Sequence, residues 1–524
     1  MMRIGRRGAL AAGFAAGLPA PLAAQPVGRL MIGTKLDPSS MDPHYFNGTE
    51  NSNVQAQCFE ALLRVDPDGK LQPGLAESWT QVDPTTWRIA LRKNVRFHDG
   101  TAFTAEDVRV TFDRVPKVEN SPGPFTAYVR NIAKIEIPDP HTLMLTTSRP
   151  DPLLIRDLAR IFIIPAKLGT AVTTQEFNGG RAAIGTGPYR LVQYVPGQRV
   201  VFARNDSYWG ERATWGEVVF LPNKSDASRA AALLAGDVDM MDFPAVSDLA
   251  AMRRNPQLSV ISRPGARIMY MQLDHDREVS PFASGPDGKN PLRDVRVRRA
   301  LSIGVDRQAI VDRVLDGAGT PAGQMPAPGL PGAARDLKAP VYDPDRARAL
   351  LAEAGVASGF KLTMHGTSDR YPGGDRVLQA MAQYYSRLGI DVSVELVPNA
   401  AFFPAATRRE YSYFFVGYGA DDVTVYLRTV LHSYDRSRNL GSSNRGRYAN
   451  PKVDALIRDL LTEMDTAKRE RMMGEAFSIA EGEDVAVVSL YYPTYDWVTR
   501  RSRVTYSPHI MGYTWAMLAE PAKA

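Results

Sequence analysis

Hydrophobic and polar residues alternate along some stretches of the chain and recur at helical spacing along others. Trp87, Ile89 and Leu91 alternate with polar or small residues, which predicts a strand with one buried face. Directly after Asn450-Pro451, the segment 453–461 places apolar residues three and four positions apart, which predicts a capped amphipathic helix. Because both patterns occur throughout the chain, we expect mixed α/β structure.

Further elements follow from the same signals. Residues 392–396 alternate like a strand, and residues 361–364 form another candidate strand. Helices are predicted where a capping sequence precedes an apolar stripe: after Thr104, after Asp343-Pro344, and over 375–389 and 423–431. We expect the apolar stripes to face the core, so they receive no role in ligand binding.

The chain is too long for a single hydrophobic core. It has 524 residues, whereas single cores stop growing at roughly 250–300 residues. Two or more lobes are therefore expected. Segments rich in Gly and Pro are candidates for lobe surfaces or for crossings between lobes, and they lie at 116–124, 179–187, 281–291 and 317–340.

The N-terminus has the layout of a secretory signal peptide. Arg3, Arg6 and Arg7 precede an apolar run over 9–18, and a small-residue cleavage site ends at Ala24. A membrane anchor is the alternative, but the run is shorter than the roughly 20 residues that a spanning helix needs. The arginine pair also leaves twin-arginine export open. We therefore predict a leader over residues 1–24 and an exported protein.

Charge and cysteine content narrow the class of protein further. Removing the three leader arginines from the 63 Lys and Arg leaves 60 basic side chains against 57 acidic, which gives no electrostatic case for nucleic-acid binding. Cys58 is the only cysteine, and it lies in an apolar stretch, so it is expected to be buried. No cysteine ends the leader, which favours a free periplasmic protein over a lipoprotein.

A search for catalytic chemistry finds no established set. The sequence contains no G-x-S-x-G elbow, no Walker A loop, no H-E-x-x-H and no C-x-x-C. The seven histidines are dispersed without metal-ligand spacing. We therefore expect no resident metal, no cofactor and no enzymatic activity. This profile fits a binding protein.

A series of sequence blocks then extends from residue 41 to residue 456. They are 41–44 (MDPH), 59–63 (FEALL), 73–79 (PGLAESW), 87–92 (WRIALR), 95–100 (VRFHDG), 103–108 (FTAEDV), 185–189 (GTGPY), 204–210 (RNDSYWG), 297–301 (VRRAL), 305–307 (VDR), 342–344 (YDP), 349–351 (ALL), 448–451 (YANP) and 453–456 (VDAL). In their order over the full length, these blocks make the chain resemble extracellular solute-binding protein family 5, which serves peptide, nickel and related importers.

The resemblance implies an α/β, two-lobed periplasmic binding protein fold that closes like a hinged clamp, with an extra domain inserted in the first lobe. It implies lobe I at 25–60, 180–266 and 490–524, the insertion at 61–179, and lobe II at 267–489. It also implies a partner, the ABC permease of the inner membrane, on which the loaded protein docks. We expect the protein to act as a monomer.

The resemblance also implies ligand-binding residues. In peptide-binding members, an aspartate of a W-x-x-D segment pairs with the ligand's amino terminus; here Asp421 takes that position and Tyr418 replaces the tryptophan. The family's following D-Y-x-D-P pattern is absent, because Asp422 is followed by Val-Thr-Val. A helix-capping role for the aspartate pair is the alternative.

Two further segments align with stretches that face the cleft in the family. Tyr45, Phe46 and Asn47 follow the first block, and Arg370-Tyr371 follow a predicted strand. Aromatic side chains can stack on a ligand, and Arg370 can clamp a carboxylate or phosphate. Arg445 is a candidate for the same task. Ordinary packing or surface roles remain the alternative for all of these residues.

The leading hypothesis is a periplasmic binding protein that captures a small polar solute, peptide or peptide-like, for an ABC importer. The second keeps the fold but changes the ligand to a metal chelate, haem, or an opine- or sugar-type solute. The third is an exported hydrolase. The sequence does not identify the solute.

Overall fold

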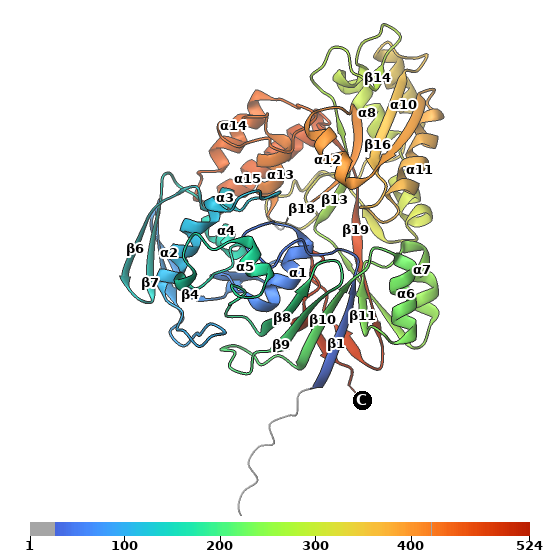
Figure 1. Ribbon diagram of the computed structural model, residues 1–524. Helices are drawn as coiled ribbons and strands as arrows, with labels where there is room; N and C mark the ends of the chain where they lie inside the picture. The colour runs from blue at the N-terminus through green and yellow to red at the C-terminus, as the bar shows by residue number, and fades with distance from the viewer. Residues whose placement is uncertain (1–26, 421, 524) are drawn as a thin grey trace, which may run out of the picture.

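The computed structural model describes residues 27–420 and 422–523. The predicted leader over 1–24 and the predicted ligand-binding residue Asp421 lie outside the described residues. Figure 1 shows sheets flanked by helices, and a long strand, β19, that runs through the middle of the molecule. The largest sheet has the strand order β14-β16-β18-β13-β19-β11-β1-β10-β9-β8. The structure is therefore mixed α/β, as the alternating periods predict.

One half of this sheet is built around the first strand. Strand β1 (Val27–Thr34) pairs in parallel with β10 (Trp215–Pro222) and β11 (Met240–Asp242). Strands β9 (Arg199–Arg204) and β8 (Tyr189–Val195) extend it in antiparallel order. The surrounding helices are α1 (Thr49–Cys58), α5 (Thr174–Asn178), α6 (Asp226–Ala235) and α7 (Val246–Arg254). Short strands β20 (Val504–Tyr506) and β21 (Ala519–Pro521) lie near the C-terminus.

The other half of the sheet is covered by helices on both faces. Its strands are β13 (Arg267–Leu273), β18 (Tyr413–Gly419), β16 (Lys361–Thr367), β17 (Asp391–Val397) and β14 (Ala283–Ser284). One face packs with α8 (Val295–Ile303), α10 (Pro344–Glu353) and α11 (Gly374–Ser386). The opposite face packs with α12 (Asn399–Thr407), α13 (Val423–Tyr426), α14 (Pro451–Leu460) and α15 (Thr466–Phe477). Alternate residues of β13 face these two cores.

A third body forms its own core. Its sheet has the order β4-β5-β7-β6, made of β4 (Ala76–Asp83), β5 (Thr86–Leu91), β7 (Thr142–Thr147) and β6 (Ile132–Asp139). Helices α2 (Ala105–Arg114), α3 (Thr126–Val129) and α4 (Leu154–Asp157) pack beside it, and β2 (Leu63–Val65) pairs with β3 (Leu71–Pro73) nearby. Figure 1 shows this body beside both halves of the main sheet.

Two backbone crossings join the halves of the main sheet. Strand β12 (Leu258–Pro264) belongs to one half, and only Gly265 and Ala266 separate it from β13 in the other. Strand β19 (Val487–Arg500) pairs with β13 near its start and with β12 and β11 toward its end. A Cβ at position 265 would lie 2.3 Å from a ring carbon of Tyr495 on β19. Glycine is therefore required where the crossings touch.

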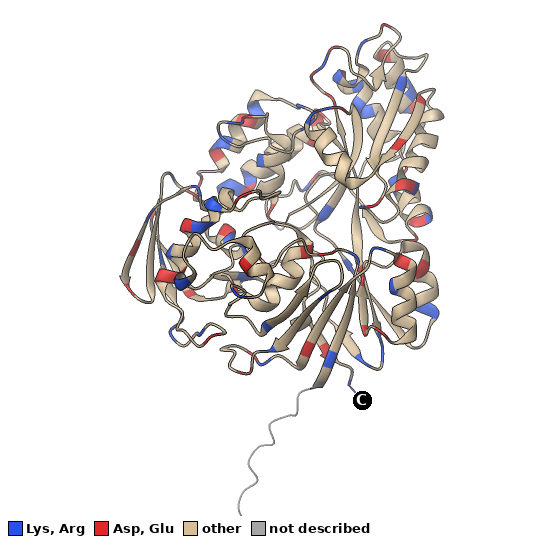
Figure 2. Ribbon diagram, viewed as in Figure 1, with Lys and Arg blue, Asp and Glu red and all other residues tan. Residues whose placement is uncertain are grey.

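The predicted local elements are confirmed. The alternating residues at 87–91 lie in β5, and those at 392–396 lie in β17. Thr104 and Asp107 form a capping box at the start of α2, and Asn450 caps α14. The helix predicted over 423–431 is split, because α13 continues as a π-helical segment at Leu427–Leu431. Figure 2 shows basic and acidic residues interspersed along the ribbon.

A buried ion pair fastens the third body to the first half of the sheet. Arg114, at the end of α2, donates to both carboxylate oxygens of Asp42 at 2.9 and 2.7 Å, and both side chains are almost fully buried. Thr174 donates to the same carboxylate at 2.8 Å, and His44 contacts Arg114 at 2.7 Å. Burial and the neighbouring guanidinium lower the pKa of His44 to about 4. The imidazole is therefore neutral and can accept from Arg114.

A second set of charges lies between the third body and the other half of the sheet. Asp157 ends α4, and its carboxylate lies 3.8 Å from Arg428 of the π-helical segment. Arg156 lies 3.7 Å from Asp422, which also caps α13 by accepting from the backbone of Thr424. Burial raises the pKa of Asp157 to about 7, against the opposing effect of Arg428. This contact region therefore contains a carboxyl group that titrates near neutrality.

Replacing Arg114 with methionine should lower the stability of the protein by about 3–5 kcal/mol, because Asp42 would stay buried without its partner. Urea unfolding of the purified variants measures the change. The control is Arg109→Met on the same helix, where the arginine side chain is 41% exposed and pairs with Glu106 and Asp113. It should cost less than about 1 kcal/mol. Equal losses for the two variants would contradict the role of the buried pair.

Asp157 should make the stability depend on pH. Its folded pKa of about 7 lies above its ordinary value of 3.8, so the folded state holds the proton more tightly and stability falls as pH rises between these values. Asp157→Asn should remove about 2–4 kcal/mol of this fall. Unfolding series from pH 4 to pH 8 measure it, with the exposed Asp113→Asn as control. Parallel curves for wild type and Asp157→Asn would refute the assignment.

Candidate functional site

A cavity of about 410 Å³ lies where the two halves of the sheet and the third body meet. This volume falls in the range of sites that bind small molecules. The lining comes from segments far apart in the sequence: 35–36, 46–50, Tyr128, Arg160, 243–244, Val246, Arg267, Met269, Leu315, Ala318, 370–372, 417–420, Val425, Tyr491, 493–496, Met511 and Tyr513. Every body of the protein thus contributes to the wall.

Five of the residues singled out from the sequence line this cavity. They are Phe46, Asn47, Arg370, Tyr371 and Tyr418. They come from the loop before α1, the loop after β16 and strand β18. The fold therefore brings together three segments that the sequence resemblance treats separately.

The remaining predicted site residues lie elsewhere or outside the described part. Tyr45 and Arg445 are not among the residues that line the cavity. The backbone carbonyl of Tyr45 accepts from Ser121. Arg445 lies over the ring of Phe403, 5.5 Å from its centre. Asp421, which the structure does not describe, follows the lining residue Ala420, so its role as an ammonium partner stays a prediction.

Hydrogen bonds fix several of the lining side chains. Asn47 donates to the hydroxyl of Tyr128 at 2.6 Å, which links the loop before α1 to the third body. The hydroxyl of Tyr418 accepts from Thr429 at 3.1 Å, and its ring packs at 5.9 Å against Tyr426. These contacts reduce the conformational freedom that the side chains would otherwise lose on binding.

The loop after β16 presents an aromatic ring and a cation together. The hydroxyl of Tyr371 donates to the carbonyl of Gly417 at 3.4 Å, and its ring lies edge-on to Phe415. The guanidinium of Arg370 lies 5.7 Å from the centre of the Tyr371 ring and 5.5 Å from that of Phe403. Arg370 is exposed at the rim, where it can meet an entering solute.

Sequence reasoning missed the charged and aromatic residues on the crossing strands. Arg267 stands at the start of β13, and Tyr491 and Tyr495 lie on β19. The one available signal was a cation directly before the apolar run at 268–271. Such a cation equally fits a strand that begins at the surface, so the pattern did not identify a site.

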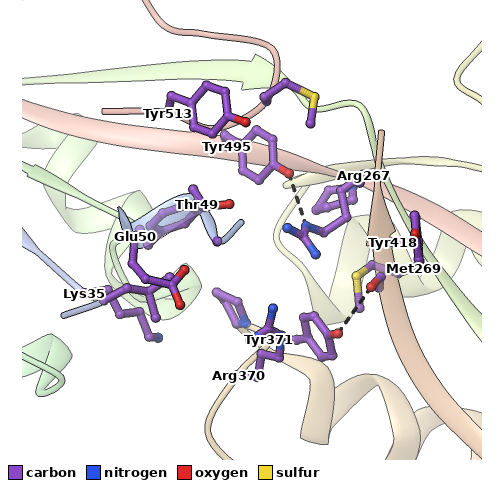
Figure 3. Close-up of a pocket in the computed structure, with 18 of the residues that line it drawn as sticks. Lys35, Thr49, Glu50, Arg267, Met269, Arg370, Tyr371, Tyr418, Tyr495 and Tyr513 are labelled. Carbon is purple, nitrogen blue, oxygen red and sulfur yellow. Dashed lines mark hydrogen bonds between the residues drawn. The ribbon is translucent and has the colours of Figure 1, made fainter. Parts of the chain in front are cut away.

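Acidic and basic groups on the opposite side were also missed. Glu50 and Lys35 line the cavity, and Figure 3 shows them across from Arg267 and Met269. Lys35 pairs with Asp226 at 3.3 Å. Glu50 has no ion-pair partner within the part of the chain that the structure describes. This wall therefore presents a free carboxylate to the cavity.

The lining combines aromatic rings with charged groups. Aromatic rings, the carboxylates of Glu50 and Asp496, and guanidinium groups surround the cavity, and its described wall contains no His, Ser or Cys side chain. No group of three or more His, Cys, Asp or Glu side chains within 27–420 and 422–523 could hold a metal ion. Over the same ranges, no helix combines the length and apolar character needed to cross a bilayer.

Comparisons with known proteins agree with this geometry. The chain matches the model of the bacterial extracellular solute-binding proteins, family 5 Middle, over residues 70–438. It is 29% identical over 500 residues to the "Probable D,D-dipeptide-binding periplasmic protein DdpA" of Escherichia coli K12, covering 93% of this chain and 92% of the relative.

Two solved structures share the fold. The periplasmic binding protein DppA of Helicobacter pylori, in complex with the peptide STSA, has a TM-score of 0.78 at 22% identity and covers 95% of this chain and 99% of its own. AgaA of A. tumefaciens R10, in complex with agropinic acid, has a TM-score of 0.75 at 25% identity, with the same coverage. The predicted two-lobed periplasmic binding protein fold is confirmed. The chain belongs to the bacterial extracellular solute-binding proteins of family 5.

Proposed function

We propose that this protein is the periplasmic substrate-binding component of an ABC importer and that it captures a small peptide or peptide-like solute. The observation that carries the proposal is the cavity between the halves of the main sheet, lined by the strands that cross between them. A solute enclosed there contacts both halves at once. It then stabilises the closed arrangement of the clamp, which is the form that a membrane permease recognises.

The charged groups of the cavity wall favour a ligand that carries both a positive and a negative charge. Burying the charged ends of a peptide costs free energy unless protein groups meet them. The described wall offers Glu50 to a cation and Arg267 to an anion. The relatives' names include a D,D-dipeptide and the peptide STSA, and agropinic acid in AgaA keeps an opine-type solute as the second candidate.

The remaining features of the proposal follow from the same reasoning. Separate hydrophobic cores support a division into lobe I (25–60, 180–266, 490–524), an insertion (61–179) and lobe II (267–489), with departures at the bounds: Ile164 and Phe177 pack in the core of lobe I, and Tyr491 packs in a core of lobe II. The relatives' periplasmic names and the predicted leader at 1–24 support export. The protein then binds without catalysis, acts as a monomer and docks on the permease.

Peptide ligands should raise the melting temperature of the purified protein by several degrees at about 100 times the dissociation constant. Small-angle scattering should show a smaller radius of gyration with the same ligand. Tyr371→Ala should weaken binding by about tenfold or more, because it removes an aromatic wall. Tyr342→Ala is the control, since Tyr342 packs on Tyr384 away from the cavity. If no peptide or opine changed the melting temperature or the shape, the proposal would fail.

A further inference from the structure

Strand β13, one of the crossing strands, carries a single charged side chain beside the cavity. Arg267 is the first residue of β13, and the rest of that strand, from Ile268 to Leu273, is buried. The Arg267 side chain reaches the cavity and lies on its wall, as Figure 3 shows. A guanidinium placed this close to the core costs free energy unless it has acceptors.

The neighbouring strand leaves room for this side chain. Strand β18 pairs with β13 so that Gly419 faces Arg267 and Gly417 faces Met269. A Cβ at position 417 would lie 2.6 Å from the sulfur of Met269 and 3.2 Å from Cδ of Arg267. Glycine at 417 thus creates a shallow trough over which the arginine extends. The register of β13 and β18 therefore fixes the position of the Arg267 guanidinium.

The hydrogen bonds of Arg267 are incomplete. Its Nε donates to the hydroxyl of Tyr495 at 3.2 Å. Within the part of the chain that the structure describes, Nη1 and Nη2 have no hydrogen-bond acceptor and no carboxylate lies within 4.0 Å. The hydrogen bond to the Tyr495 hydroxyl fixes the orientation of the guanidinium plane. The terminal nitrogens of Arg267 then face the cavity. Four donor hydrogens are thus directed toward the space that a solute would occupy.

The buried arginines of the protein differ from the half-buried Arg267. Arg114 meets the carboxylate of Asp42, and Arg229 meets Asp226 together with two backbone carbonyls. Arg307 donates to the carbonyls of Ser302 and Ser489. In each of these the terminal nitrogens have acceptors within the protein. The contrast indicates that the acceptor for Arg267 comes from outside.

We infer that Arg267 binds a carboxylate of the solute through its terminal nitrogens, so that the anionic end of the ligand lies against the crossing strand. This inference rests on the proposed binding function and names the class of ligand, a carboxylate-bearing amino acid conjugate. A planar guanidinium pairs with a carboxylate through two parallel hydrogen bonds. Glu50 lies on the opposite wall, where its carboxylate can pair with the cationic end of a zwitterionic ligand.

The test compares ligands with and without the carboxylate. Free dipeptides, free tripeptides and N-(1-carboxyethyl) amino acids are each titrated beside their carboxamides by calorimetry. Wild-type protein should bind the free acids about 10–150-fold more tightly than the amides, the range of a hydrogen bond between charged groups. Arg267→Gln should lose that preference and bind both forms with similar affinity. Arg267→Lys, which keeps the charge, should retain part of it.

The matched control is Arg263→Gln, because Arg263 lies on the neighbouring crossing strand β12 but pairs with Asp68 at 2.6 Å and does not line the cavity. It should keep the preference for free acids. If Arg267→Gln weakens the binding of free acids but not of amides, residue 267 contacts the ligand carboxylate directly and does not act through a structural effect. An Arg267→Gln variant that weakens acids and amides equally would overturn the inference.

The wild-type titrations remain decisive even where a variant fails to fold. Wild-type protein that binds amides as tightly as acids would overturn the carboxylate contact and leave the proposed binding function intact. Wild-type protein that binds none of the probes and shows no change of shape in scattering would overturn the proposed function, and this inference with it. The peptide and opine arms show which source supplies the carboxylate.

Discussion

The rest of the structure depends on one constraint: the two halves of the main sheet are joined through two backbone crossings. Strand β19 and the β12–β13 crossing connect them, and the crossings touch at Gly265 and Tyr495. The residues at this junction also line the cavity, including Arg267 and Tyr495. A solute that contacts them therefore acts on the same strands about which the halves can rotate, and binding is mechanically linked to closure.

Local sequence signals were sufficient for much of the fold. Elements such as α2 and α14 carry a capping residue and an apolar stripe within a dozen positions, so their information is contiguous. The cavity is different, because its parts come from distant segments. Arg267 and Tyr495 are 228 residues apart, and no local pattern shows that β13 and β19 will pair.

Residues of the candidate site could be predicted only where the resemblance to the family indicated which segments face the cleft, because local patterns do not show how distant segments come together. Phe46, Arg370 and Tyr371 were found through alignment with cleft segments, and the structure places them on the wall. Tyr45 was chosen by the same alignment but does not line the cavity, because neighbouring positions in a loop point in different directions. Arg445, a candidate for the same task as Arg370, does not line it either. The side chains on the crossing strands had no motif to identify them, because their role depends on the sheet register.

The charged contact between α4 and the π-helical segment has a consequence for how affinity evolves. Asp157 and Arg428 join bodies that must come together over the cavity, yet neither lines it. Any change that favours their approach raises the population of the binding-competent form and tightens every ligand by the same factor. Substitution at such positions can tune how strongly the importer scavenges while leaving unchanged what it scavenges.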